Sequence, residues 1–174
     1  MDSKVSKWFN QIGIHLVQGY GLTETSPVIS AENDNCIKYG SVGKPMNSVE
    51  ILIKNPDSNG IGEIAVKGPN VMLGYYNNET QTNAVLKDGW FYTGDLGYID
   101  KDGFLFITGR KKDLIVLKNG KKVFPEEIEL LINRLDEVEE SFVYGLPDRN
   151  DKNDVKVAVK ICLLYTSDAA DDGE

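Results

Sequence analysis

Three residues that could hold one nucleotide occur in a fixed order along the chain. Tyr20 comes first, in a Gly-Tyr-Gly-Leu-Thr-Glu run; Asp95 follows in Tyr-Thr-Gly-Asp, and Arg110 in Gly-Arg-Lys-Lys-Asp. A carboxylate can accept hydrogen bonds from both hydroxyls of a ribose, and a guanidinium can donate to oxygens of the same sugar or its phosphate. A flat aromatic ring can cover a purine. The ordered set therefore indicates an enzyme that handles a nucleotide.

Each of these residues also has an ordinary structural interpretation. Tyr20 could be a core tyrosine in a tight turn, Asp95 a loop aspartate, and Arg110 a surface arginine. Two further candidate site residues also have ordinary interpretations: Glu24 could be a solvated glutamate, and Gly120 could be the glycine of a hairpin turn. The spacing and order of the whole set favour the functional interpretation.

Other kinds of catalytic centre find little support in the residue types present. His15 is the only histidine, and Cys36 and Cys162 are the only cysteines, which disfavours a Ser-His-Asp or Cys-His centre and a Cys/His zinc site. No GxGxxG or Walker pattern follows a predicted strand. The net charge of −8 gives no reason to expect nucleic-acid binding, which requires clustered basic residues.

Hydrophobic spacing predicts a helix and then mostly strands before position 108. Apolar residues at helical spacing predict a helix around 8–12, and the apolar run 15–17 predicts a buried strand that leads into a loop at 19–24. Ligands of open α/β sheets sit beyond the carboxyl ends of strands, so this loop is well placed to line a site. Successive hairpins are predicted from 49 to 107, with a short helix at 78–87. The expected strands are 49–54, 63–67, 90–93, 97–100 and 104–108.

After Gly109 the pattern changes to mixed helix and strand. A strong hairpin turn is predicted at 118–121, and Pro125 followed by two acids opens a helix. The expected apolar face of that helix comprises Ile128, Leu131, Ile132 and Leu135. Further strands are expected at 114–117, 140–144 and 155–161. A second, α+β domain is therefore predicted to begin here.

Three motifs, at 18–27, 89–95 and 109–116, resemble those of the adenylate-forming (AMP-binding) superfamily, and most closely its bacterial long-chain fatty acid-CoA ligases. The resemblance runs from about residue 5 to 161. It implies α/β with α+β architecture: the end of the large N-terminal domain, with a sheet edge and a small β-barrel subdomain, followed by the start of the small α+β C-terminal domain. The implied division is 1–109 for the large domain, 110–113 for a hinge and 114–161 for the small domain.

The resemblance also implies roles for individual residues. Gly19, Tyr20 and Gly21 would hold adenine, Asp95 would accept from the ribose hydroxyls, and Arg110 would act on the same sugar. Thr23 would donate to a phosphate oxygen, and Glu24 would place the Mg²⁺ that accompanies the triphosphate. Lys112 would occupy the hinge between two half-reactions, and Gly120 would line the coenzyme A channel. The implied cofactors and co-substrates are ATP, Mg²⁺ and coenzyme A.

Other segments of such enzymes have no counterpart in this sequence. Neither the Ser/Thr/Gly-rich phosphate loop nor the late Gly-Lys motif is found, so we expect a piece of a longer enzyme.

Residues 162–174 match nothing in the family and resemble a translated sequencing adapter; a genuine acidic tail is the alternative. This segment carries four acids and no Lys or Arg, so the rest of the chain carries a net charge of −4.

The function expected from the resemblance is ATP-dependent activation of a long-chain fatty acid as an acyl-adenylate, with transfer to coenzyme A. Two alternatives stay open: an amino-acid adenylation domain of a peptide synthetase, and a catalytically silent nucleotide-binding chain.

The only cysteine outside 162–174 is Cys36, and no leader or membrane span is evident, which favours a reducing, cytoplasmic location. Peripheral contact with a membrane is left open.

Overall fold

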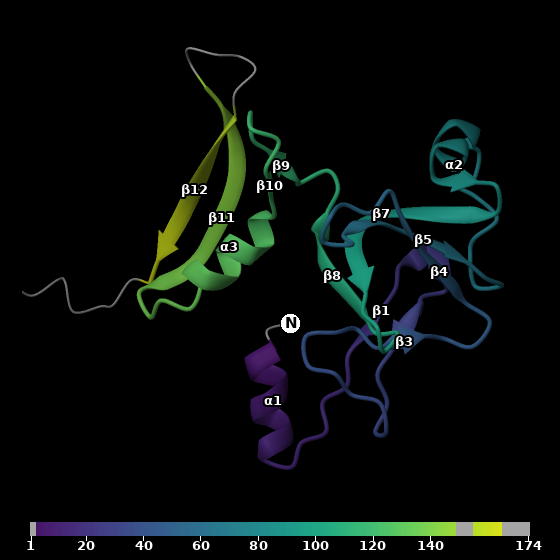
Figure 1. The fold of residues 1–174 in the computed structure, drawn as a ribbon, viewed down its shortest axis with the longest axis horizontal. Coiled ribbons are helices and arrows are strands. Elements are labelled where there is room, and N and C mark those ends of the chain that lie inside the picture. The colour runs from purple at the N-terminus through teal and green to yellow at the C-terminus, as the bar shows by residue number, and fades with distance from the viewer. Residues whose placement is uncertain (1–2, 149–154, 165–174) are drawn as a thin grey trace, which may run out of the picture. The chain divides into compact units, whose positions relative to one another are not determined.

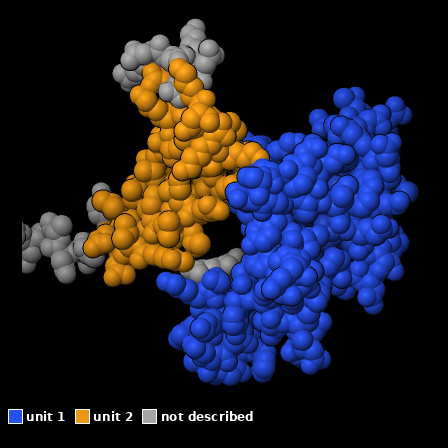
Figure 2. Space-filling model, in the orientation of Figure 1, with its two compact units in different colours: residues 1–112 blue, residues 113–174 orange. Residues whose placement is uncertain are grey.

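The computed structural model describes residues 3–148 and 155–164. Contact between segments divides the chain into two compact units, 1–112 and 113–174, coloured separately in Figure 2. The division falls within 110–113, the segment expected to be a hinge; its action as a hinge stays a prediction. The predicted fold class, α/β with α+β, is confirmed.

The first unit begins with the predicted helix, α1 (Ser3–Gln11), followed by a small antiparallel sheet in the order β1-β2-β3. Its strands are β1 (Gly19–Tyr20), β2 (Ser30–Ala31) and β3 (Lys44–Pro45), with the 3-10 turn η1 (Thr23–Thr25) between the first two. The prediction of a buried strand at 15–17 is wrong. Val17 is 47% exposed, and among the described residues no segment pairs with 15–17, so its backbone lacks the ladder partner that a strand requires.

The larger sheet of the first unit has five antiparallel strands. Its order is β4-β5-β7-β6, with β8 also paired to β7 (Figure 1). The elements are β4 (Glu50–Lys54), β5 (Gly62–Lys67), α2 (Glu79–Val85), β6 (Leu86–Lys87), β7 (Trp90–Ile99) and β8 (Leu105–Arg110).

These elements match the predicted hairpins, with two differences. The segments 90–93 and 97–100 are parts of one strand, β7, and the helix predicted at 78–87 ends at Val85, because Leu86–Lys87 pairs with β7 as strand β6. Their core is a cluster of Ile29, Ile64, Val66 and Leu105, all fully buried, so the two sheets of this unit share one apolar centre. Burial of this kind stabilises by about 1.5–3 kcal/mol for each such side chain.

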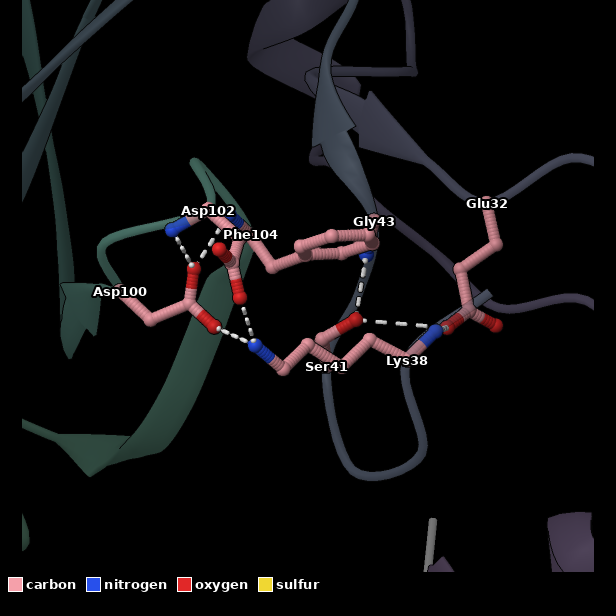
Figure 3. A network of polar contacts seen from close by, with 7 residues as sticks. All are labelled: Glu32, Lys38, Ser41, Gly43, Asp100, Asp102 and Phe104. Atoms are coloured by element: carbon pink, nitrogen blue, oxygen red, sulfur yellow. Dashed lines mark hydrogen bonds and ion pairs between the residues drawn. The ribbon is translucent and has the colours of Figure 1, made fainter. Parts of the chain in front are cut away.

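A network of polar contacts ties the loop before β3 to the turn between β7 and β8 (Figure 3). Lys38 Nζ donates to Asp100 Oδ2 at 2.5 Å and to Asp102 Oδ2 at 2.7 Å. At the start of the loop, Glu32 has a buried carboxylate. It accepts hydrogen bonds from the Lys38 main-chain N–H at 2.9 Å and from Ser41 Oγ at 3.3 Å. The loop is therefore held to the β7–β8 turn and to its own first residue by charge-assisted hydrogen bonds.

The second unit contains the mixed elements expected after Gly109. They are β9 (Ile115–Val116), β10 (Lys122–Val123), α3 (Pro125–Ile132), β11 (Val138–Pro147) and β12 (Val155–Leu163). The hairpin turn at 118–121 is confirmed, because Leu117 N–H donates to Lys121 O at 2.9 Å. So is the helix that opens at Pro125.

Two details of the second unit differ from prediction. The expected apolar face of α3 is only partly covered: Leu131 is 61% and Leu135 56% exposed, and the helix ends at Ile132 because the chain turns there toward β11. Strand β12 continues through Cys162 and Leu163, which pair with β11. Whether 162–174 is native stays a prediction, and 165–174 lie outside the described residues.

Candidate functional site

Asp95 lies where strand β7 leaves its ladder with β5. Tyr92 pairs with Ala65 and Leu96 with Glu63, so three residues of β7 stand opposite one residue of β5. Gly94, at the centre of this bulge, has φ of 75°, a conformation that glycine adopts without steric cost. The bulge thus turns the Asp95 carboxylate out of the regular pleat.

The neighbouring Thr93 holds the bulge in place. Its hydroxyl donates to Ile64 O at 2.9 Å and accepts from the Asp95 main-chain N–H at 3.1 Å. On the other side, Lys111 N–H donates to Gly94 O at 2.8 Å. The position of the Asp95 carboxylate is therefore set by main-chain contacts to both adjacent strands.

Arg110 stands directly opposite Asp95, because the two residues are register partners on β8 and β7. Arg110 Nε lies 3.3 Å from Asp95 Oδ1. Asp95 is 5% exposed, whereas the Arg110 side chain is 53% exposed. The pair presents a buried acceptor beside a cationic donor that reaches solvent.

Tyr20 completes this set from a different sheet. Its hydroxyl donates to Asp95 Oδ2 at 2.6 Å, and its ring packs against the Ile29–Ile64–Val66–Leu105 core cluster. Burial of the phenol, together with the hydrogen bond to Asp95, raises the pKa of Tyr20 far above its usual range. Tyr20 therefore stays a neutral donor at any physiological pH, and both oxygens of Asp95 have a partner.

A cavity of about 380 Å³ opens beside this group. Its volume lies within the range of about 300–1,000 Å³ that is usual for small-molecule sites. Three cationic side chains and one carboxylate suit a ligand that carries both hydroxyls and phosphate. Its lining residues are Thr93, Gly94, Asp95, Arg110, Lys111 and Lys112.

The first predicted motif divides between strand β1 and turn η1. Thr23 is exposed on the turn, and Glu24 is half-buried, with its Oε1 accepting from the Tyr75 hydroxyl at 2.9 Å. The turn is closed by Thr25, whose Oγ1 accepts from Leu22 N–H at 3.0 Å and donates to Leu22 O at 2.9 Å. Thr23 and Glu24 therefore have a fixed backbone.

The two glycines around Tyr20 have different surroundings. A Cβ on Gly21 would lie 1.6 Å from Pro27 O, whereas a Cβ on Gly19 would lie 3.3 Å from its nearest atom, Ser30 O. The missing side chain at Gly21 thus serves the close approach of the chain's own backbone. That either glycine also admits adenine stays a prediction.

Two other predicted site residues lie outside the Tyr20–Asp95–Arg110 contact. Lys112 lines the same cavity and is exposed. Gly120 is in the turn between β9 and β10, in the second unit, with φ of 79° and no atom within 4 Å of the position of a Cβ. The structure thus brings together Tyr20, Asp95, Arg110 and Lys112.

Sequence reasoning missed three residues of this region. They are Thr93, which supports the bulge; Tyr75, which binds Glu24; and Lys111, whose Nζ lies 2.7 Å from Glu63 Oε2. The Thr-Gly-Asp order could have revealed Thr93, since a threonine hydroxyl often accepts from the N–H two residues later. Nothing in local sequence pairs Tyr75 with Glu24.

Comparison with known proteins finds similar sequences and similar folds. A family model described as AMP-binding enzyme matches residues 1–76. The chain is 43% identical over 159 residues to the long-chain-fatty-acid–CoA ligase of Yersinia pestis, an alignment that covers 88% of the chain and 28% of that protein. It is 42% identical over 142 residues to the 2-succinylbenzoate–CoA ligase of a Geobacillus strain, covering 78% and 29%. The chain thus spans less than a third of the length of these relatives.

Solved structures give the same result. The o-succinylbenzoate coenzyme A synthetase of Bacillus subtilis, in complex with ATP and magnesium ion, superposes with a TM-score of 0.84 at 34% identity, covering 94% of this chain and 34% of that one. Sequence and structure therefore point to one group of proteins. The chain belongs to the adenylate-forming, AMP-binding enzyme family.

Proposed function

We propose that the chain supplies the nucleotide-binding edge of an ATP-dependent acyl-CoA synthetase that activates a long-chain fatty acid as its adenylate and transfers it to coenzyme A. The observation that carries the proposal is the contact of Tyr20 and Arg110 with the Asp95 carboxylate, where Asp95 and Arg110 line one cavity. Because the chain covers 28% of the ligase from Yersinia pestis, this activity is proposed for the whole enzyme that contains it.

Asp95 and Arg110 would bind the sugar of the nucleotide. A carboxylate offers about four lone-pair positions, and the structure uses two of those on Asp95, one for Tyr20 and one for Arg110. The remaining positions would accept from the two ribose hydroxyls. The Arg110 guanidinium, half exposed at the cavity, would donate to the sugar or its α-phosphate.

Tyr20 would serve the adenine while its hydroxyl holds Asp95. The ring is fixed by the core on one side and by the hydrogen bond at its tip, so a purine would meet a rigid aromatic surface. Thr23, exposed on turn η1, would donate its hydroxyl to a phosphate oxygen. These residues bind and orient ATP, so that the carboxylate of the acid can attack its α-phosphorus in line.

Glu24 would hold Mg²⁺ that arrives with the nucleotide. Among residues 3–148 and 155–164, no group of three His, Cys, Asp or Glu side chains could hold a metal by itself. A single carboxylate fits Mg²⁺, which proteins usually bind through one or two carboxylates plus substrate phosphates. When bound, the ion would supply charge neutralisation on the triphosphate. The related synthetase from Bacillus subtilis was solved with ATP and magnesium ion.

Lys112 and Gly120 would serve the second half-reaction, in which coenzyme A displaces AMP. Lys112 follows Lys111, which contacts the rest of the first unit twice. Its side chain forms an ion pair with Glu63, and its main-chain N–H donates to Gly94 O. A change in backbone angles would therefore be confined to the residues after Lys111. Gly120, with open space where a Cβ would stand, would allow a pantetheine thiol to pass.

The acid substrate is the finer part of the proposal. Relatives named as long-chain-fatty-acid–CoA ligases match over 88–94% of the chain at 39–43% identity, which favours a fatty acid. A 2-succinylbenzoate–CoA ligase matches at 42% over a shorter stretch, so an aromatic acid is the competing substrate. No helix in the described part of the chain has the length and apolarity to cross a membrane. Because Cys36 is the only cysteine outside 162–174, we propose a reducing, cytoplasmic location.

A pyrophosphate–ATP exchange assay on the whole enzyme tests the proposal. We expect exchange with long-chain fatty acids, and thioester formation once coenzyme A is added. The Asp95→Ala variant should lower the exchange rate by about 100-fold, since the nucleotide would lose a charged partner. Exchange driven only by 2-succinylbenzoate would overturn the substrate, exchange driven only by amino acids would favour a peptide-synthetase adenylation domain, and no exchange with any acid would overturn the enzyme activity.

A further inference from the structure

The loop between β5 and α2 is fastened to the turn that carries Glu24. Met72 N–H donates to Glu24 O at 2.8 Å. The Asn70 side-chain amide donates to Thr25 O at 2.9 Å and to Val28 O at 3.0 Å. Three hydrogen bonds thus hold the loop against η1 and the segment that follows it, so the relative position of the two segments is built into the first unit.

Tyr75 extends from this loop to the Glu24 side chain. Its hydroxyl donates to Glu24 Oε1 at 2.9 Å, across 51 positions of sequence. The Tyr75 main-chain N–H donates to Thr82 Oγ1 at 2.9 Å, and that hydroxyl in turn donates to Asn78 O at 2.8 Å. The first turn of helix α2 therefore fixes the backbone from which Tyr75 extends.

The contact leaves Glu24 arranged for a second partner. Tyr75 engages Oε1, and the described hydrogen bonds give no partner to Oε2. A glutamate side chain has several rotatable bonds, and ordering it in advance removes an entropic cost from cation binding.

We propose that Tyr75 is a positioning residue for the metal-binding carboxylate, holding Glu24 in the rotamer that meets Mg²⁺ on the bound nucleotide. The inference rests on the proposed function, in which Glu24 contacts that ion. In this role Tyr75 acts through the Glu24 carboxylate alone. Its neighbour Tyr76 is 93% exposed, against 36% for Tyr75, which gives a matched control one residue away.

The test compares Tyr75→Phe, Tyr76→Phe and Glu24→Gln in the whole enzyme. The first readout is calorimetric binding of ATP with and without Mg²⁺, which requires no turnover. The gain in ATP affinity that Mg²⁺ provides should fall by about three- to tenfold in Tyr75→Phe, as expected for the net contribution of one solvent-exposed hydrogen bond. ATP binding without Mg²⁺ and the melting temperature should stay unchanged, as should all values for Tyr76→Phe.

The second readout is the Mg²⁺ concentration that gives half-maximal pyrophosphate exchange. Tyr75→Phe should raise it by the same factor while leaving the rate at saturating Mg²⁺ within about twofold, a split that general structural damage would not produce. Adding Tyr75→Phe to Glu24→Gln should change the Mg²⁺ dependence no further, because the hydroxyl acts through the carboxylate.

The outcomes separate the inference from the function on which it rests. If Glu24→Gln reduces the Mg²⁺ effect and Tyr75→Phe leaves it unchanged or strengthens it, the role of Tyr75 is refuted and that of Glu24 stands. If Glu24→Gln has no effect on Mg²⁺, the proposed metal role of Glu24 fails, whatever Tyr75→Phe does. Equal losses in Tyr75→Phe and Tyr76→Phe would also refute the positioning role.

Discussion

The hydroxyl of Tyr20 donates to Asp95 Oδ2 at 2.6 Å, joining two residues 75 positions apart. The bond links the small sheet β1-β2-β3 to the bulge of β7, and the same carboxylate meets Arg110 through its other oxygen. Tyr20 is therefore more than an aromatic surface. It also fixes the acceptor on which recognition of the sugar would depend.

Replacing Tyr20 with Phe should destabilise the fold through the loss of one charge-assisted hydrogen bond. We expect the free energy of unfolding in urea to fall by about 1.5–3 kcal/mol, because Asp95 is 5% exposed and water replaces the donor poorly. Tyr98→Phe is the control, since the described contact of Tyr98 is ring stacking on Phe106. Equal losses of unfolding free energy in the two variants would show that the hydrogen bond from Tyr20 to Asp95 makes no contribution of its own.

A methyl group at Gly21 should be far more damaging than one at Gly19. The Gly21 Cβ would lie 1.6 Å from a main-chain oxygen, and the backbone on both sides would have to separate. We expect Gly21→Ala to lower the free energy of unfolding by about 3 kcal/mol or more, and Gly19→Ala by about 1 kcal/mol or less. Comparable values for the two, measured by urea denaturation, would contradict the close approach of Gly21 to Pro27.

Arg110 should not tolerate replacement by lysine. Lysine keeps the charge but lacks the planar fork, so a sugar and its phosphate would lose one of two directed contacts. Calorimetry should show AMP affinity about tenfold lower in Arg110→Lys and lower still in Arg110→Met. Lys101→Met, on the β7–β8 turn, removes the same charge away from the cavity lining and should bind AMP normally. An unchanged affinity in Arg110→Met would remove this residue from the site.

Acid should weaken the Lys38–Asp100 contact. The hydrogen bond from Lys38 holds the pKa of Asp100 below its ordinary value of 3.8. Stability from the carboxylate is therefore fully present above that value and is lost as pH falls through the lowered pKa. The hydrogen bonds from Lys38 to Asp100 and Asp102 raise the pKa of Lys38, so its contribution disappears only at strongly alkaline pH.

The corresponding experiment is urea denaturation of the native protein and of Asp100→Asn from pH 7 to pH 2. The native protein should be the more stable at neutral pH, and the difference should shrink below pH 3.8 as Asp100 loses its charge. A difference that stays constant down to pH 2 would mean that the charge on Asp100 makes no contribution.

Much of the fold could be predicted because it follows from local pattern. The β4–β5 hairpin shows in alternation and turn residues, and the helix at Pro125 shows in its first turn. The strand expected at 15–17 was wrong because an apolar run specifies burial only when a partner is present. Exposure of Leu131 and Leu135 has the same origin, since helical spacing defines a face without defining what covers it.

The candidate site was predictable in part. The order of Tyr20, Asp95 and Arg110 along the chain carried the expectation that they meet, and the structure brings them into contact. Their connection through the Tyr20 hydroxyl was not predictable, because it depends on the bulge that turns Asp95 outward. The same holds for Tyr75 and Glu24, whose contact depends on how a loop packs against a turn.

The proposed role of Asp95 is to accept the ribose hydroxyls of a nucleotide held between Tyr20 and Arg110. Its most direct test is calorimetric binding of AMP and 2′,3′-dideoxy-AMP to the whole enzyme and to its Asp95→Ala variant. We predict that the native enzyme prefers AMP by about tenfold or more, and that the variant binds the two equally. A native preference that survives intact in Asp95→Ala would show that Asp95 does not bind the ribose hydroxyls.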